Sequence, residues 1–340
     1  MTELKDVLFY VTNACNMKCR HCHANSGQPL DNELNLDEIK TLFKDLYDMG
    51  IVELELTGGE PFVRPDFIRI LDMANTMDFS IKLLTNGTLL DPQKVQILSD
   101  MSIRFVQIPI EGIKSSHELL RGIGTFEPAI KAVTMLKDAG LNVQVRMTAT
   151  KKSISDVKVL AESLVAMDVD SFLVTEFIPI GRGLGLTELL LNNNEKQQLH
   201  NTLTSIRKNY GDKLLIRGDA YGYMDGMDDI AKFGTSRRSI LCGALRGDWC
   251  IIMSNGVVTT CDLIQFYTGN IRLQKMSEIW NSSPIIKAFN NFESDKLKGA
   301  CGKCNYKVIC GGCRALAFFF YGDFYDEDPM CLKAEKKLAI

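Results

Sequence analysis

The sequence lacks the features that direct a protein to nucleic acids or membranes. Its 340 residues carry 39 Lys and Arg against 42 Asp and Glu, a formal net charge of only −3, so it has no electrostatic footprint for nucleic acid or an anionic membrane. No stretch approaches the roughly 18 apolar residues of a membrane span, and the apolar run near the N-terminus is too short for a signal peptide. We therefore expect a soluble, cytoplasmic protein that binds neither nucleic acid nor membrane.

Cysteine is absent from positions 23 to 241, although the chain has eleven cysteines in all. Reducing cytoplasm disfavours disulfides, so clustered cysteines there are more often metal ligands or catalytic groups. They stand in two groups at the two ends of the chain: Cys15, Cys19, Cys22, Cys242, Cys250, Cys261, Cys301, Cys304, Cys310, Cys313 and Cys331. We expect two thiol-bearing regions separated by a thiol-free middle.

The thiol-free middle predicts alternating strands and helices. The expected strands are short and rich in β-branched residues, and several expected helices end in Gly. The strands are expected within residues 8–14, 51–59, 80–88, 103–112, 141–150 and 171–181, and the helices within 36–50, 65–77, 92–101, 126–140 and 154–168. Six βα units in series predict a parallel sheet, either doubly wound or closed into a barrel. In a barrel the chemistry lies at the C-terminal ends of the strands, where the front cysteines fall.

The front cysteines form the motif CNMKCRHC at residues 15–22. With His21 or His23 they could complete a tetrahedral zinc site. Three buried thiols with no ligand role are a second interpretation. The third is an iron–sulfur cluster with three cysteine ligands, which leaves one iron open to a substrate or cofactor.

Three strand-end motifs together resemble the radical S-adenosylmethionine (SAM) superfamily. They are C-x3-C-x2-C after the first strand, GGEP at residues 58–61 after the second, and TNGT at residues 85–88 after the third. The resemblance covers residues 6 to about 183 and implies a partial (β/α)6 TIM-like barrel. It also implies that Cys15, Cys19 and Cys22 hold a [4Fe–4S] cluster that binds SAM. Reductive cleavage of SAM would then yield a 5′-deoxyadenosyl radical that abstracts a hydrogen from the substrate.

The same resemblance implies which other residues bind SAM. GGEP would approach the methionine ammonium, the TNGT position would contact the ribose, and a polar/arginine pair would bind the carboxylate. These residues are Gly58, Gly59, Glu60, Thr85, Asn86, Thr125 and Arg146. An alternative for Arg146 is an ion pair with Glu176. His21 stands where the family usually has an aromatic residue against adenine, whereas His23 and Glu111 have no clear role.

The back cysteines resemble the SPASM extension of radical SAM enzymes. Residues 242–261 read C-x13-G-x4-C, residues 301–313 read C-x2-C-x5-C-x2-C, and a last cysteine follows at position 331. The final spacing of two residues departs from the commoner three, which affects the ligation of Cys313. By resemblance, two fully ligated auxiliary [4Fe–4S] clusters form, which brings the total to three. The first would use Cys242, Cys250, Cys261 and Cys313, and the second Cys301, Cys304, Cys310 and Cys331.

Two further interpretations concern these auxiliary sites. A pair of zinc sites, each with four cysteine ligands, is the alternative, because CxxC knuckles build those too. Fully ligated clusters cannot bind substrate directly, so electron relay or oxidation of a substrate radical is the expected task. Asn255-Gly256 predicts a hairpin turn that brings Cys250 and Cys261 towards each other.

The sequence thus predicts a radical SAM core in residues 1–184, a connecting helix and Gly/Asp-rich loop in 185–239, and a SPASM domain in 240–340. The expected function is maturation of a ribosomal peptide by crosslinking, decarboxylation or epimerisation. Such a peptide would be presented by a separate leader-recognition protein or bind without one, and a flavodoxin or ferredoxin would supply electrons. Oxidation or decarboxylation of tetrapyrrole side chains is the alternative. An iron–sulfur electron carrier without SAM chemistry is the alternative from another class.

Overall fold

A computed structural model describes residues 4–218, 242–264 and 266–336. Most of the Gly/Asp-rich loop expected before residue 240 lies outside the described residues. None of the described helices has the length and apolar character needed to cross a membrane.

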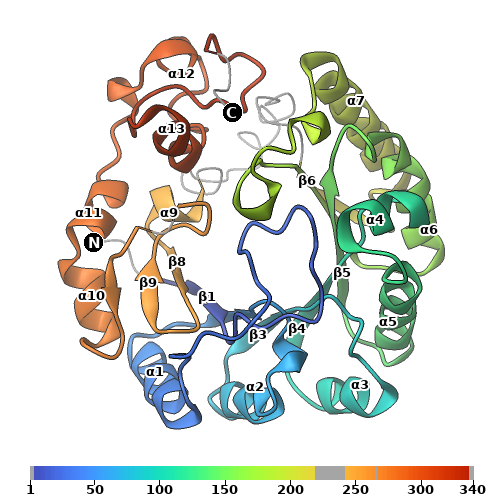
Figure 1. Cartoon of the computed structure of the whole chain (residues 1–340), viewed down its shortest axis with the longest axis vertical. Helices are drawn as coiled ribbons and strands as arrows, with labels where there is room; N and C mark the ends of the chain where they lie inside the picture. The colour runs from blue at the N-terminus through green and yellow to red at the C-terminus, as the bar shows by residue number, and fades with distance from the viewer. Residues whose placement is uncertain (1–3, 219–241, 265, 337–340) are drawn as a thin grey trace.

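The described residues form one curved sheet of ten strands, in the order β10-β9-β8-β1-β2-β3-β4-β5-β6-β7. The six strands expected from the sequence are all present and pair in parallel: β1 (Asp6–Tyr10), β2 (Glu53–Thr57), β3 (Ser80–Leu84), β4 (Ile103–Pro109), β5 (Val143–Ala149) and β6 (Ser171–Glu176). The long segment after β1 crosses the hollow of the curved sheet in Figure 1. The partial barrel predicted from the sequence is confirmed.

Helices cover the outer face of the sheet (Figure 1). Those of the barrel are α1 (Leu36–Asp48), α2 (Phe67–Thr76), α3 (Pro92–Ser99), α4 (Lys114–Arg121), α5 (Phe126–Asp138), α6 (Val157–Ala166) and α7 (Asn193–Tyr210). Helix α1 begins at a capping box in which Asn35 accepts from the amide of Glu38, which satisfies amides left free at the helix start. Helix α4 was not expected, because its eight residues are mostly polar and give only a short apolar pattern.

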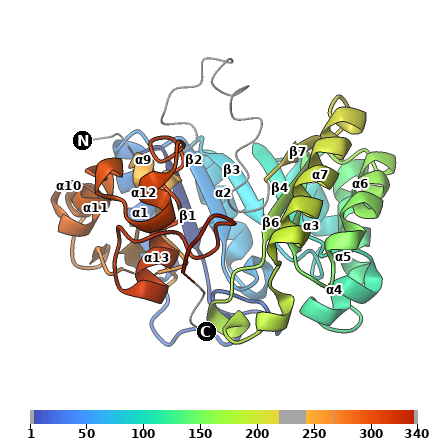
Figure 2. The same cartoon turned by 90° about the horizontal axis from the view of Figure 1, so that it is seen from above.

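The sheet does not stop at the predicted domain boundaries. Strand β7 (Leu215–Arg217), from the connecting segment, pairs in parallel with β6, and β8 (Trp249–Ile252), from the C-terminal region, pairs in parallel with β1. The hairpin strands β9 (Val257–Thr259) and β10 (Gly269–Asn270) extend that edge. The C-terminal helices lie together on the left of the molecule in Figure 2: α9 (Gly243–Arg246), α10 (Met276–Ser282), α11 (Pro284–Asn290), α12 (Gly299–Lys303) and α13 (Arg314–Tyr321). The domain limits stay predictions, but the two ends of the chain share one sheet.

The predicted hairpin at Asn255-Gly256 forms, with Gly256 at φ +82°, a left-handed conformation that glycine adopts without strain. The hairpin also brings the two segments side by side, since Ile251 pairs with Thr259, but the side chains of Cys250 and Cys261 lie in different surroundings. Cys250 is fully buried in the main apolar core, whereas Cys261 lines a cavity.

A group of charged side chains lies near the N-terminal ends of the first three strands. The Nζ of Lys82 lies 2.6 Å from Asp6, 2.7 Å from Glu53 and 2.8 Å from Glu55, and only 9% of the lysine side chain is exposed. Burial, followed by the charge of Glu55, raises the pKa of Asp6 to about 6. The lysine therefore holds together carboxylates that would otherwise repel one another.

Candidate functional site

The three front cysteines lie on one loop at the C-terminal end of β1. The loop is closed by backbone hydrogen bonds from Cys15 to Gly27 at 2.9 Å and from Gly27 to Asn13 at 3.0 Å. Burial and, to a lesser extent, the nearby Glu60, Cys19 and Cys22 together raise the pKa of Cys15 to about 11. The three thiols are therefore close enough to influence one another's ionisation.

The two glycines of GGEP fit against this loop. A Cβ atom at Gly58 would collide with the backbone of Thr12, and one at Gly59 with the carbonyl of Ala14. The amide of Gly59 donates to Thr12 at 2.8 Å. The approach of these glycines to SAM stays a prediction. The close packing in the structure gives an independent reason why both positions are glycine. They allow the second strand end to pack directly on the cysteine loop.

Glu60 joins the second strand end to the third. It is fully buried and accepts from the Thr85 hydroxyl at 2.6 Å, the Asn86 amide at 2.7 Å and the Phe62 amide at 3.2 Å. The side chain of Asn86 in turn donates to Asn16 of the cysteine loop at 2.9 Å. The structure thus brings together three residues predicted to contact SAM and links them to the loop between Cys15 and Cys19.

A buried network at the mouth of the barrel was not predicted. Glu111 is 1% exposed and accepts from Arg121 Nε at 2.8 Å, from the Thr148 amide at 2.6 Å and from His21 Nε2 at 3.2 Å. Although burial alone would raise the pKa of Glu111, Arg121 and His21 hold it well below its usual range. Glu111, to which the sequence assigned no clear role, therefore anchors Arg121.

Arg121 reaches the cysteine loop. Its Nη1 lies 3.8 Å from Cys19 Sγ. Burial raises the pKa of Cys19, and the Arg121 charge opposes that increase. A ligand cysteine must be deprotonated, so this guanidinium favours the thiolate. Three thiols on one loop beside a buried cation fit the predicted [4Fe–4S] cluster. Nothing in the sequence singled out Arg121, which is the last residue of helix α4.

Replacing Glu111 with glutamine should weaken the barrel mouth. The amide keeps the shape of the side chain, but it leaves Arg121 without its buried counter-charge. We expect the free energy of unfolding to fall by about 1–3 kcal/mol, measured by denaturant titration of the cluster-free protein.

Glu127→Gln is the matched control, because Glu127 pairs with Lys114 on the surface at 3.1 Å. That variant should unfold like the wild type. Equal stability of both variants would contradict the anchoring role of Glu111.

The segment after β6 clamps the cysteine loop from the other side. Arg182 donates from Nε to the Cys19 carbonyl at 2.9 Å and from Nη1 to the Ser26 carbonyl at 2.6 Å. Gly181, at φ +56°, has no room for a Cβ atom beside the carbonyls of Cys22 and His23. This glycine-rich segment therefore shapes the loop that carries the thiols.

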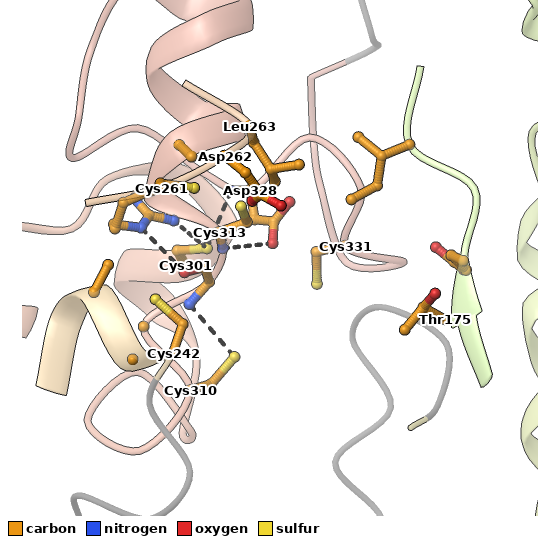
Figure 3. Close-up of a pocket in the computed structure, with 18 of the residues that line it drawn as sticks. Thr175, Cys242, Cys261, Asp262, Leu263, Cys301, Cys310, Cys313, Asp328 and Cys331 are labelled. Carbon is orange, nitrogen blue, oxygen red and sulfur yellow. Dashed lines mark hydrogen bonds between the residues drawn. The ribbon is translucent and has the colours of Figure 1, made fainter. Parts of the chain in front are cut away.

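A cavity of about 670 Å³ connects the barrel mouth with the C-terminal region. Its barrel wall includes His21, Arg146, Thr148 and Thr175, and its other wall carries seven of the eight C-terminal cysteines: Cys242, Cys261, Cys301, Cys304, Cys310, Cys313 and Cys331. Figure 3 shows Thr175 of β6 across the cavity from the cysteines that it labels. A ligand in the cavity would therefore contact the C-terminal cysteines and, on the barrel side, His21 and His23 of the front cysteine loop, whereas Cys15, Cys19 and Cys22 do not line the cavity.

Arg146 and Thr125, the two residues predicted to bind the carboxylate of SAM, lie in different parts of the structure. Arg146 lines the cavity together with Glu176. Thr125 instead donates its hydroxyl to the Gly122 carbonyl at 2.6 Å, in the turn between α4 and α5. Glu176 is paired with Lys196 at 3.2 Å. The arginine thus stands where a ligand could reach it, whereas the threonine shapes a turn.

His23, without a predicted role, bridges the two regions. Its Nε2 lies 3.1 Å from the Tyr10 hydroxyl and 3.2 Å from Asp262 Oδ2. Since His23 follows Cys22 and Asp262 follows Cys261, this contact ties the front cysteine loop to the C-terminal cysteines.

The C-terminal cysteines along the cavity fall into two groups. Burial raises the pKa of Cys313, and the thiols of Cys261 and Cys242 are near enough to raise it further. Burial likewise raises the pKa of Cys331 to about 11, with further contributions from Cys301 and Cys310. Cys304 acts in the same way on Cys310. These groups match the predicted ligand sets except for one member.

The exception is Cys250. It is fully buried among apolar side chains of the main core and is not among the residues that line the cavity. The structure does not bring it together with Cys242, Cys261 and Cys313.

Two buried charged residues that the sequence did not single out lie between the groups. Arg314, 2% exposed, places Nη2 3.7 Å from Cys301 Sγ. Asp328 accepts from the Cys313 amide at 2.7 Å and donates its own amide to Cys301 Sγ at 3.3 Å. These contacts, drawn in Figure 3, link the two groups through backbone amides and one guanidinium.

All eleven cysteines are free of disulfides. Within residues 4–218, 242–264 and 266–336, no three His, Cys, Asp or Glu side chains are placed to hold one metal ion.

Comparison with known proteins identifies both regions. The family model of the radical SAM superfamily matches residues 9–164, and that of the SPASM iron–sulfur cluster-binding domain matches residues 242–305. The chain is 30% identical to an AdoMet-dependent heme synthase from Nitratidesulfovibrio vulgaris over 98% of this chain and 94% of that protein. It is 28% identical to the mycofactocin maturase MftC of Mycobacterium tuberculosis, over 97% and 83%.

A solved structure has the same fold. Streptococcus suis SuiB bound to its precursor peptide SuiA matches with a TM-score of 0.81 at 17% identity, over 97% of this chain and 76% of that one.

Proposed function

The chain belongs to the radical SAM superfamily and carries a SPASM domain, and we propose that it matures a ribosomally synthesised precursor peptide. It is an enzyme of SAM-dependent radical chemistry, so the interpretation as an electron carrier without SAM is not retained. It holds SAM and iron–sulfur clusters, and we propose that the clusters number three. We also propose reduction by a flavodoxin or ferredoxin, in the cytoplasm.

The clusters and SAM, when bound, supply the radical chemistry; the chain supplies position and shielding. Cys15, Cys19 and Cys22 would hold the front cluster, with Arg121 favouring the thiolate of Cys19. Arg146, in the middle of β5, would bind the carboxylate of SAM from the wall of the cavity. His21, held by Glu111 at 3.2 Å, would present its ring to the adenine.

The observation that supports a peptide substrate is the charge of the cavity. Its acidic lining residues, Asp6, Glu176, Asp262 and Asp328, nearly match its basic ones, Arg146, Arg246, Lys307, Arg314 and Lys333. Arg246 and Lys307 also pair with Asp248 and Asp295 outside the lining. Such a wall suits the neutral backbone of a peptide better than the several carboxylates of a tetrapyrrole, which would require surplus cations.

A tetrapyrrole is the second candidate, and the 30% identity to a heme synthase across nearly the whole chain favours it. Modification would then occur at its carboxylated side chains. Both candidates require the same front cluster and the same cavity, and differ in what enters it.

The experiment offers both substrates to the reduced enzyme with SAM. One is any short peptide whose reading frame neighbours the gene, deuterated throughout, and the other is iron-coproporphyrin III deuterated on its side chains. We expect deuterium in 5′-deoxyadenosine from the peptide, measured by mass spectrometry. Deuterium transfer from the tetrapyrrole alone would overturn the peptide proposal, and transfer from neither would overturn both.

A Cys15/Cys19/Cys22→Ala variant is the control for this experiment. It should keep about 8 of about 12 irons and form no 5′-deoxyadenosine. Product formed by that variant would place SAM cleavage elsewhere.

A further inference from the structure

The position of Cys250 follows from the alternation of side chains along β8. Cys250 is paired in register with Val7 of β1, and both belong to the main core together with Phe9 and Ile252. All four are fully buried. Their side chains occupy the face of the sheet that packs on the outer helices.

The neighbours of Cys250 point the other way, because successive side chains of a strand alternate between the two faces. Ile251 packs with Leu8 and Tyr10 in a separate inner cluster, against which Trp249 also packs. Trp249 lines the cavity. The backbone of the sheet therefore stands between the Cys250 thiol and the cavity.

The other members of the first predicted ligand set lie on the cavity side. Cys242, Cys261 and Cys313 all line the cavity, and Figure 3 shows the three around one part of it. Two carboxylates of the cavity wall beside these cysteines are already engaged, Asp262 by His23 at 3.2 Å and Asp328 by the Cys313 amide at 2.7 Å.

We propose that Cys250 is a core residue and that Cys242, Cys261 and Cys313 alone hold the first auxiliary cluster, which leaves one iron open to a ligand from the cavity. The second site keeps four thiols: Cys301, Cys304, Cys310 and Cys331. The open position would take an oxygen, nitrogen or sulfur donor of a molecule bound in the cavity. The first auxiliary site thus becomes a place where a ligand is held, in contrast to the electron relay expected of a fully ligated cluster.

This inference rests on the proposed set of three clusters but not on the nature of the substrate. The iron content of the wild-type protein tests the number of clusters separately from the role of Cys250. About 12 irons per chain supports three clusters, whatever Cys250 does.

The first test replaces Cys250 with alanine and, separately, with valine, neither of which can bind iron. We expect at least one of the two to keep about 12 irons per chain after anaerobic reconstitution, whereas Cys261→Ala keeps about 8. Circular dichroism confirms that each variant is folded. If both Cys250 variants fold and both keep only about 8 irons, the thiol is a ligand and the proposal is overturned.

The second test leaves Cys250 in place, so it stands even where its variants fail to fold. The Cys15/Cys19/Cys22→Ala variant retains only the auxiliary sites. We expect ¹³C-cyanide, added to this reduced protein, to show carbon hyperfine coupling in electron–nuclear double resonance. Adding Cys261→Ala should abolish the coupling. Absence of coupling in the triple variant, or its persistence after Cys261→Ala, would show that this site has no open iron.

Discussion

Replacing Gly59 with alanine should remove the front cluster and, with it, the cleavage of SAM. The added Cβ would collide with the carbonyl of Ala14, the residue directly before Cys15. A rigid backbone atom cannot move aside as a flexible side chain could, so the cysteine loop must shift. A displacement of about 1 Å at a reacting centre costs about 100-fold in rate. We expect the rate of 5′-deoxyadenosine formation to fall by at least that factor. The protein should also lose about 4 of its about 12 irons.

Gly27→Ala is the matched control within the same loop. A Cβ atom at Gly27 would meet nothing within 4 Å, and its backbone bonds to the loop would remain. This variant should keep the iron and the activity of the wild type. A Gly59→Ala protein with full iron content and normal product would show that the loop tolerates the shift.

Replacing Lys82 with methionine should destabilise the barrel by about 3–5 kcal/mol, the range measured when one partner of a buried ion pair is removed. Without the ammonium, Asp6, Glu53 and Glu55 remain as like charges close together, with at most 30% of each side chain exposed. Denaturant unfolding at pH 7.5 measures the effect.

The pH dependence of that variant follows from the sign of the shift at Asp6. Its pKa in the folded protein, about 6, already lies above its ordinary value of 3.8, so the folded state holds the proton more tightly. The penalty for its charge is therefore present above pH 6 and relieved as the pH falls towards 4. Loss of Lys82 raises the folded pKa further, so the defect of Lys82→Met should shrink from pH 7.5 to pH 5.

The control for Lys82 is Lys44→Met, which breaks an exposed pair with Asp48 at 2.8 Å on helix α1. It should unfold like the wild type at both pH values. A Lys82→Met defect that is as small as that of Lys44→Met, or that grows towards pH 5, would contradict the role assigned to the buried lysine.

The sequence predicted the barrel because its signals are local. Short β-branched strands and amphipathic helices alternate, and the six predicted strands are all found. What it missed depends on contacts between distant segments. Nothing near residue 250 indicates a partner at residue 7, so the pairing of β8 with β1, and with it the buried place of Cys250, could not be read from spacing.

The residues of the functional site could likewise be predicted only in part. The thiols stand out by residue type and spacing, which is how the two C-terminal groups were nearly recovered. Arg121 and Asp328 act through contacts formed only in the folded chain, with Cys19 at 3.8 Å and with the Cys313 amide at 2.7 Å. Charged side chains are common in any sequence, so burial is what distinguishes these two, and burial depends on the fold.

The pairing of β8 with β1 has a consequence for synthesis on the ribosome. Strand β1 is among the first segments to emerge, but its partner at residues 249–252 is about 240 residues later. At about 5–20 residues per second, the nascent chain spends roughly 10 to 50 seconds with that edge of β1 unpaired. An exposed edge strand is a template for association with other chains. Emergence of β8 is therefore the event that protects β1, and a fragment ending before residue 249 keeps that edge open permanently.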